Sequence, residues 1–325
     1  MTSKSNISTT KDKRFGTLVT LSNTTVTGAH MKVTVAPERG SNICHFSYGS
    51  CDIFYCDEAM LQSSGFTGNF ALWPIPNRLE NHEYTFERTR YAIQGLDRKV
   101  DRNLVHGFVF DQSWQFVEPV VNEDTPILNT FFDFDPTHPY FNGYPFPSRL
   151  SLAIKLEPDG LRVTYTVQNK GSQRMPFGFG LHPCFKLLPD TRVQIPAKYV
   201  MEANQELLPT GKLTDVANDH DRDLRKPRKV ASLRLDDVYT GITSGKWAVI
   251  DHPAERFRIH LETSDDFTHI VMYASSGPFF CLENQTCPTN ALNLLAKGLG
   301  QEAHVIELDP GQEHTGYIKY KIEPY

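Results

Sequence analysis

The sequence predicts an all-β protein built as an antiparallel sandwich or barrel with few short helices. Three observations support this fold class. Apolar and polar residues alternate with a period of two in many short runs, and clusters of Gly, Pro, Asn and Asp separate these runs. Helical periodicity is scarce. Strands that follow one another without intervening helices are typical of sandwiches and barrels rather than of βαβ units.

The clearest element is a hairpin near the middle of the chain. Alternate residues of 150–156 are Leu or Ile, and alternate residues of 161–167 are Leu, Val or Tyr. Residues 157–160, with the sequence EPDG, have the composition of a turn. Because alternate side chains of a strand point to opposite faces, each run has one buried face, and the two strands are predicted to pair.

Similar runs predict further strands in order along the chain. They cover residues 31–35 and 43–48, which flank a turn at 37–40, a pair within 108–116, and residues 247–250, 257–261, 270–273, 305–308 and 318–322. One short helix is predicted over 289–298, where a Thr or Asn cap precedes apolar residues and a Gly ends the run. Residues 54–83 and 202–229 are expected to be inserted loops.

The composition indicates one ordinary globular domain. The chain has 325 residues, of which 39% are hydrophobic and 22% charged, and no repeat or linker-like stretch divides it. Residues 16–325 are expected to form this domain, after a flexible polar tail at residues 1–15. The tail lacks the apolar segment of a secretory signal, and no apolar run approaches the ~18 residues of a membrane span. We therefore expect a cytoplasmic protein without membrane contact.

Charge and cysteine content exclude other classes. The 33 basic and 38 acidic residues give a net charge of −5, which provides no basic footprint for nucleic acid. The densest basic stretch, residues 222–229, holds one Asp and a Pro, follows further Asp residues, and is expected to be a solvated loop. The six cysteines form no C-x-x-C pair, which favours reduced thiols over a disulfide framework or a zinc site.

Four segments contain candidates for chemistry. Asn77 and Arg78 follow a proline-braced turn, and a guanidinium group can bind several hydroxyl oxygens at once. His106 opens an aromatic segment, and His182 follows alternate glycines that leave room for a ligand or another backbone. Glu283 ends an apolar strand, where a carboxylate needs a partner or a function. A purely structural role is the alternative for each of these residues, and the residues alone do not decide between the two roles.

Some aromatic residues and another histidine complicate this picture. His138 lies in a segment rich in proline and aromatic residues, and from the residues alone it is as good a candidate as His182. Trp73, Phe179 and Phe280 are candidates for the wall of a cleft or for the core.

Together the four segments resemble the aldose 1-epimerase (mutarotase) family, in order and over nearly the whole chain after roughly residue 25. The matching pieces are Asn77-Arg78, His106-Gly107, the stretch from the hairpin to GLHPCF, and CLENQTCPTNALNLL. The resemblance implies a large antiparallel β-supersandwich of the galactose mutarotase-like type with an open sugar-binding cleft. It also implies an isomerase that interconverts the α and β anomers of a free sugar, with no cofactor and no metal.

The resemblance implies a role for each catalytic candidate. Glu283 would be the general base that takes the proton from the anomeric hydroxyl, and His182 the general acid that protonates the ring oxygen. His106 would assist near the ring oxygen. The functional histidine of the family follows the second strand of the hairpin, which favours His182 over His138.

The resemblance also implies how the sugar is held. Asn77 and Arg78 match positions that bind sugar hydroxyls, and Asp237, in the sequence LDDVY, matches the sugar-binding aspartate. The chain departs from the family pattern after the base, where Asn284 and Gln285 stand in place of Pro and an aromatic residue. Cys184 stands where an aromatic residue is common and is expected to affect packing only.

Three other functions stay open. A hexose 6-phosphate mutarotase would need converging cations, for which Arg78, Arg149 and Arg174 are candidates. A sugar-binding protein without turnover would explain the altered residues after the base. A metalloenzyme would use His106, His182 and Glu283 as ligands. In each case a small molecule is the expected partner, and the protein is expected to be a monomer or homodimer.

Overall fold

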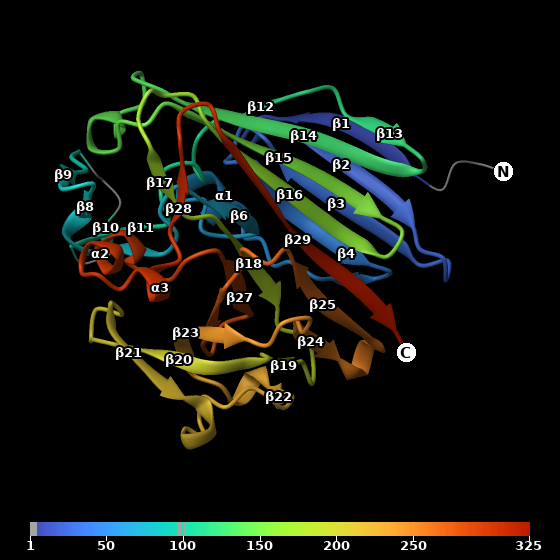
Figure 1. The fold of residues 1–325 in the computed structure, drawn as a ribbon. Helices are drawn as coiled ribbons and strands as arrows, with labels where there is room; N and C mark the ends of the chain where they lie inside the picture. Colours follow the sequence, from blue (N-terminus) through green and yellow to red (C-terminus); the bar gives the residue numbers. More distant parts are fainter. Residues whose placement is uncertain (1–4, 96–98, 101) are drawn as a thin grey trace.

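Antiparallel sheets account for most of the computed structural model, which describes residues 5–95, 99–100 and 102–325 (Figure 1). The largest sheet has ten strands in the order β12 (Gln115–Phe116), β14 (Thr125–Phe134), β15 (Ser148–Glu157), β16 (Gly160–Asn169), β29 (Glu313–Pro324), β25 (Phe257–Thr263), β24 (Ala248–His252), β19 (Arg192–Gln194) and β22 (Arg228–Lys229), with β13 (Val120–Asn122) also paired to β14. No helix within the described residues has the length and apolar character needed to cross a membrane.

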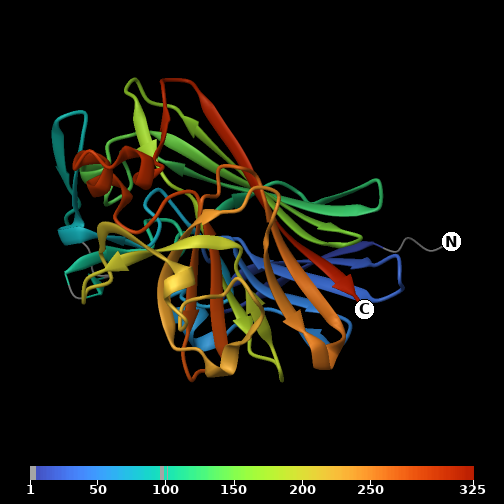
Figure 2. The same cartoon turned by 60° about the horizontal axis from the view of Figure 1, so that its bottom comes forward.

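Two further sheets complete the main architecture. One has seven strands in the order β21 (Pro209–Asp215), β20 (Ala197–Ala203), β23 (Leu235–Ile242), β26 (His269–Ala274), β27 (Phe279–Gln285), β18 (Gly180–Lys186) and β6 (Asn69–Leu72). The other has five strands in sequence order, β1 (Asn6–Asp12), β2 (Gly16–Thr24), β3 (His30–Ala36), β4 (Asn42–Tyr48) and β5 (Cys51–Asp52). The five-stranded sheet packs against β14 and β15, and the seven-stranded sheet lies beside this sandwich (Figures 1 and 2).

Short elements connect these sheets. The small strand groups are β10 (Lys99–Val100), β11 (Asn103–Val105) and β7 (Arg78–Leu79), then β8 (Glu83–Phe86) with β9 (Thr89–Ala92), and β17 (Met175–Phe177) with β28 (Ile306–Leu308). The helices are α1 (Glu58–Ser63), α2 (Ala291–Ala296) and α3 (Gly300–Ala303), with 3₁₀ turns at Glu80–His82, Phe141–Gly143, Val216–Asn218, Val230–Ser232 and Pro253–Glu255. The helix predicted over 289–298 is confirmed as α2.

The predicted central hairpin is confirmed as β15 and β16. The two strands pair in register from Ser148 opposite Asn169 to Glu157 opposite Gly160. Every apolar side chain that the alternation assigned to the inner face is at most 3% exposed. Full burial of one such side chain stabilises the fold by about 1.5–3 kcal/mol, so the alternation itself accounts for the position of this hairpin in the core.

The structure corrects the expected N-terminal tail. Residues 6–12 form β1, which pairs along its whole length with β2. The sequence of β1, NISTTKD, is almost entirely polar and exposed, so no apolar alternation indicates it; its Ile and Thr residues are nevertheless good strand formers.

Two other sequence predictions are wrong. The expected strand pair within 108–116 is absent, because the chain turns within the segment, where the Gln112 N–H donates to the Val109 carbonyl at 3.2 Å. Only Gln115–Phe116 is a strand, paired with β14. The expected loops at 54–83 and 202–229 contain β6 and β21. All four residues of β6 are buried, so this strand has no alternation to detect.

A buried histidine, His252 in β24, makes stability depend on pH. Its Nδ1 lies 3.0 Å from Thr191 Oγ1, and burial lowers its pKa from 6.5 to about 4 despite the raising effect of Asp251 and Glu255. The native state therefore binds fewer protons than the unfolded state between these pH values. Stability is fully present above pH ~6.5, and about 3 kcal/mol is lost as the pH falls to ~4.

Urea unfolding at pH 7 and pH 4.5 tests this, with His252→Asn as the comparison. The variant should lose less stability than the wild type over this interval. An equal loss in both proteins would assign the acid sensitivity to other groups.

Candidate active site

A cavity of about 280 Å³ opens over one face of the seven-stranded sheet. This is close to the lower end of the ~300–1,000 Å³ range of small-ligand pockets, a size suited to a single sugar ring. Its lining residues come from seven separate parts of the chain: Met60, Phe66, Asn77, Arg78, Val105, His106, His182, Cys184, Asp236, Val271, Tyr273, Phe279, Cys281 and Glu283. Five of the six predicted site residues are among them, and Asp237 is not.

Strand register brings His182 and Glu283 together. In the β18–β27 pair, Gly180 lies opposite Gln285 and Cys184 opposite Cys281, so the same register places His182 opposite Glu283. Their side chains meet with 3.2 Å between His182 Nε2 and Glu283 Oε1. The sequence separation of these two residues is large, and only the antiparallel pairing makes them neighbours.

Burial of His182 and Glu283 affects the pKa values of both side chains. The Glu283 side chain is 3% exposed and that of His182 15%. Burial raises the pKa of Glu283, and the opposing effects of His182 and of a hydrogen bond from Gln285 Nε2 to Oε2, 2.9 Å, do not cancel this rise. Burial, the largest single effect, lowers the pKa of His182, but the charge of Glu283 and the contact with Cys184 together outweigh it, and this pKa is raised. Glu283, with a pKa of about 7, can therefore exchange a proton near neutral pH beside a histidine whose pKa of about 9 keeps it protonated.

Aromatic contacts fix the His182 ring. It stacks on Phe70, with ring centres 4.6 Å apart and an angle of 14° between the planes. His106 stands edge-on to the same ring, with centres 4.8 Å apart. Both histidines therefore face the same part of the cavity.

A tight backbone crossing places His106. Its φ angle is 66°, and Gly107 follows with a φ of 70°. A Cβ atom on Gly107 would lie 2.2 Å from the carbonyl oxygen of Trp73, so only glycine fits this position. The His106 N–H donates to the Asn77 carbonyl at 2.8 Å, and the Phe108 N–H to that of Trp73 at 2.9 Å. The two loops that carry His106 and Asn77-Arg78 are thus held side by side.

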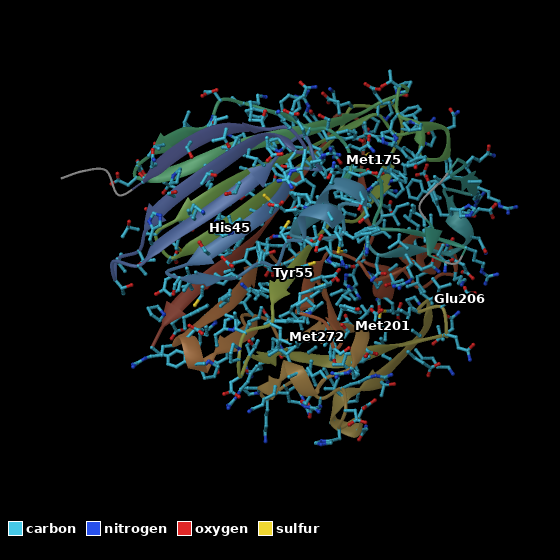
Figure 3. The ribbon with its side chains drawn as sticks, turned by 180° about the vertical axis from the view of Figure 1, so that it is seen from behind. His45, Tyr55, Met175, Met201, Glu206 and Met272 are labelled. Carbon is cyan, nitrogen blue, oxygen red and sulfur yellow. The ribbon has the colours of Figure 1, made fainter. Side chains whose placement is uncertain are left out.

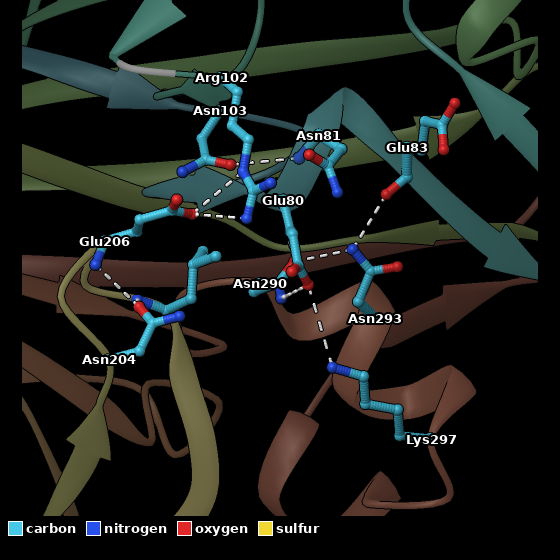
Figure 4. A network of polar contacts seen from close by, with 11 residues as sticks. Glu80, Asn81, Glu83, Arg102, Asn103, Asn204, Glu206, Asn290, Asn293 and Lys297 are labelled. Carbon is cyan, nitrogen blue, oxygen red and sulfur yellow. Dashed lines mark hydrogen bonds and ion pairs between the residues drawn. The ribbon is translucent and has the colours of Figure 1, made fainter.

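A polar network next to Arg78 includes Glu80, Asn290 and Asn293, and Figure 4 shows these three residues. Asn290 donates its N–H to the Arg78 carbonyl at 2.8 Å, and its Oδ1 accepts from the Glu80 N–H and from Asn293 Nδ2. Asn293 Nδ2 also donates to the Glu83 carbonyl at 2.9 Å. Arg78 Nη1 donates to Asn77 Oδ1 at 3.0 Å, so the two predicted sugar-binding side chains contact each other.

The structure replaces Asp237 by its neighbour at the cavity. Successive residues of β23 point to opposite faces. Asp236 lies opposite Tyr273, which lies opposite Cys281, and all three line the cavity. Asp236 Oδ2 is 3.9 Å from Arg78 Nη2, whereas Asp237 Oδ1 is bound by Arg222 Nε at 3.0 Å. Asp237 contributes instead to a small neighbouring hollow of about 10 Å³, which is too small for a sugar.

The aromatic wall of the cavity is made by residues that the sequence did not single out. Trp73, Phe179 and Phe280 are at most 1% exposed and belong to the core. The cavity is walled instead by Phe66, Tyr273 and Phe279. Phe279 stacks on Tyr55, which is labelled in Figure 3, with ring centres 5.2 Å apart.

The remaining candidates lie away from the cavity. His138 is 8% exposed and packs on Phe134, with ring centres 4.6 Å apart. Arg149 is paired with Asp133 and Arg174 with Glu307, so neither of these two cations lines the cavity, where Arg78 does. The basic stretch at 222–229 is balanced locally, for example by the Arg225–Asp223 pair at 2.8 Å.

A model of the aldose 1-epimerase family matches residues 22–321 of the chain. The chain belongs to the aldose 1-epimerase family.

Comparison with related sequences and solved structures supports the same fold. A protein of Escherichia coli K12 described as uncharacterized protein YphB is 26% identical over 263 residues, covering 78% of this chain and 83% of that protein. A galactose mutarotase-like protein from Clostridium acetobutylicum superimposes with a TM-score of 0.85 at 19% identity, over 99% of this chain and 98% of that one. For galactose 1-epimerase from Lactobacillus acidophilus NCFM, the TM-score is 0.77 at 17% identity, over 99% of both chains. The predicted galactose mutarotase-like β-supersandwich is confirmed.

The two positions after Glu283 differ from the family pattern, and the structure shows where both residues lie. Gln285 is fully buried and its amide donates to Glu283, so it contacts the carboxylate from behind. Asn284 is 5% exposed, and neither residue lines the cavity. The change therefore alters the support of Glu283 and leaves the lining of the cavity to other residues.

Proposed function

We propose that this member of the aldose 1-epimerase family is a mutarotase that interconverts the α and β anomers of a free, unphosphorylated aldose. One observation carries the proposal: a glutamate carboxyl group and a histidine, 3.2 Å apart, lie in a cavity that has the size of one sugar ring. The anomeric hydroxyl and the ring oxygen are bonded to the same carbon. A base for the first and an acid for the second must therefore be close neighbours, as Glu283 and His182 are.

Proton transfer between these groups and the sugar balances over the cycle. Glu283 accepts the proton of the anomeric hydroxyl while the bond between C1 and the ring oxygen breaks and His182 protonates that oxygen. The open aldehyde rotates about its C1–C2 bond. For ring closure, His182 takes the proton back, the hydroxyl oxygen attacks the other face of the carbonyl, and Glu283 returns its proton to the new anomeric oxygen. No net proton or cofactor is consumed.

Other side chains have roles in holding the sugar. Asn77 and Arg78 offer donors to its hydroxyls, and the cavity position of Asp236 assigns to it the acceptor role expected for Asp237. His106 faces His182 and assists at the ring oxygen. The six cysteines are free thiols, which fits a reducing compartment such as the cytosol.

NMR saturation transfer between the two anomers tests the proposal, with a panel of neutral aldoses and their 6-phosphates. We expect exchange to be accelerated for a neutral aldose, and phosphate or sulfate not to compete, because Arg78 alone does not form a cluster of cations. Acceleration restricted to 6-phosphates would contradict the choice of substrate. Binding of a sugar without acceleration would contradict the enzyme assignment.

A pair of neighbouring substitutions tests the assignment of the aspartate. Asp236→Asn is expected to raise KM for the sugar by roughly 10-fold, the effect of about 1.4 kcal/mol of lost binding, because a charged acceptor is stronger than a neutral one. Asp237→Asn removes the partner of Arg222 outside the cavity and should leave KM within ~2-fold of the wild type. Measurement of KM and kcat in parallel separates the two, and a larger KM effect at Asp237 would restore the original expectation.

A further inference from the structure

Two cysteines and a histidine, all potential metal ligands, lie together in the lining of the same cavity. Cys184 in β18 and Cys281 in β27 are directly opposite each other in the antiparallel pair, and His182 precedes Cys184 by two residues on the same face. One ligand atom from each of these three side chains lies within 4.8 Å of the other two. Cys184 and Cys281 are 1% and 0% exposed, yet both contribute to the cavity lining.

We propose that His182, Cys184 and Cys281 form a binding site for a thiophilic metal ion, with Zn²⁺ as its preferred occupant. Two thiolates and one imidazole are a ligand set of open zinc sites, in which the fourth position is left to water or a ligand. The cavity supplies that open position. No sequence motif indicates such a site, because Cys184 and Cys281 are cross-strand neighbours rather than members of a C-x-x-C motif.

The geometry requires only a small adjustment. Ligand atoms about 2.3 Å from a tetrahedral zinc ion are ~3.8 Å apart, so the observed limit of 4.8 Å demands a contraction of about 1 Å. Rotation about the Cα–Cβ bonds of the two cysteines moves their sulfur atoms by this amount. The sheet backbone can stay in place.

The surroundings match what a metal-bound histidine needs. His182 Nδ1 is buried and has no hydrogen-bond partner, so the ring has a nitrogen available for a ligand. Its Nε2 lies 3.2 Å from Glu283. In metal sites, a carboxylate commonly binds the ring nitrogen that does not ligate the metal and so orients the histidine. Two thiolates also neutralise the divalent cation, which limits the cost of burying it.

Occupation of this site would remove His182 from proton transfer. The metal-loaded protein is therefore an inhibited form of the proposed mutarotase, a consequence that rests on the proposed function. Metal binding itself does not rest on it.

Spectroscopy of the wild-type protein tests the site directly. Reduced, metal-free protein is titrated with Zn²⁺ against a chromophoric chelator, and with Co²⁺ while the absorption spectrum is recorded. We expect one metal ion per chain and a thiolate-to-cobalt charge-transfer band. Absence of the charge-transfer band, or a stoichiometry well below one metal ion per chain, would overturn the proposal.

Substitutions locate the ligands. Cys184→Ser and Cys281→Ser should each weaken Zn²⁺ binding by more than ~100-fold, because even a residue that only orients a ligand is worth ~10–100-fold. Cys51→Ser is the matched control, since this half-buried thiol lies in the five-stranded sheet, donates a hydrogen bond to Glu255 at 3.0 Å and does not line the cavity. Unchanged binding in both cavity variants would refute the site. If either variant fails to fold, the charge-transfer band and the metal stoichiometry of the wild type still decide.

Activity provides a separate readout. Zn²⁺ should inhibit anomer exchange by the wild type, a chelator should restore it, and folded Cys184→Ser should resist inhibition. A protein without mutarotase activity would refute the proposed function and leave the metal titration to decide on the site.

Discussion

Glu283→Gln is expected to lower kcat for anomer exchange by ~10²–10⁴-fold, the usual contribution of a positioned general base. Glutamine keeps the shape of the side chain and can still accept the hydrogen bond from Gln285, but it cannot take a proton at neutral pH. KM should change little, because the sugar hydroxyls keep their contacts with Asn77 and Arg78. Saturation-transfer rates at several sugar concentrations give the two parameters separately.

Stability distinguishes this loss from a damaged fold. Burial of the Glu283 carboxylate raises its pKa and so opposes folding of the charged form, and an uncharged glutamine removes that cost. The melting temperature of Glu283→Gln should therefore equal or exceed that of the wild type. Glu262→Gln serves as the control and should retain activity. It breaks a 3.2 Å ion pair with Lys321 within the ten-stranded sheet, whereas Glu283 lies in the seven-stranded sheet. Activity of Glu283→Gln within ~3-fold of the wild type would assign the base elsewhere.

The hairpin of β15 and β16, and β25 in the same sheet, were predictable because one face of each is buried, and this imposes a period of two. β2 also alternates and was not predicted, and strands without alternation were missed. In β6 both faces are buried, and in β1 most side chains are exposed, so neither has an alternation. Apolar and polar residues alternate along a strand only where its two faces lie in different environments, so a strand with two similar faces lacks this pattern.

Strand pairing decides the rest of the candidate site. A shift of one residue exchanges the two faces of a strand, so Asp236 and Asp237 cannot be told apart without the register of β23 against β26. The opposition of Cys184 and Cys281 is likewise a property of the β18–β27 pair. Such pairings join residues that are distant in the chain, and the sequence of one strand carries no information about its partner.

The resemblance to a family supplied what pairing could not. It selected His182 over His138, and the structure gives the physical difference between them. His138 is packed among aromatic rings of the core, whereas His182 faces an open cavity beside a carboxylate. The two histidines have similar neighbours in the sequence, and they differ in their surroundings in the folded structure.

His182→Phe is expected to lower kcat by ~10²–10⁴-fold through loss of the general acid. Phenylalanine can keep the stacking on Phe70, so the ring position and the fold should be preserved. His138→Phe is the matched control: it loses the hydrogen bond from the Tyr140 N–H to Nδ1, about 1 kcal/mol of stability, and should retain activity. Equal losses of activity in the two variants would indicate general damage to the fold.

A titration separates a catalytic His182 from one that only fills space. The positive charge of His182 lowers the pKa of Glu283, so its removal in His182→Phe must raise that pKa further above its ordinary value. Glu283 is then ionised only at higher pH, and the acid limb of any residual activity shifts upward. The carboxyl carbon signal that disappears in Glu283→Gln reports this pKa by NMR in chelator-treated protein. An unchanged or lower pKa would mean that the two side chains are not coupled in solution, and a mechanism that moves protons between them and one sugar carbon would have to be abandoned.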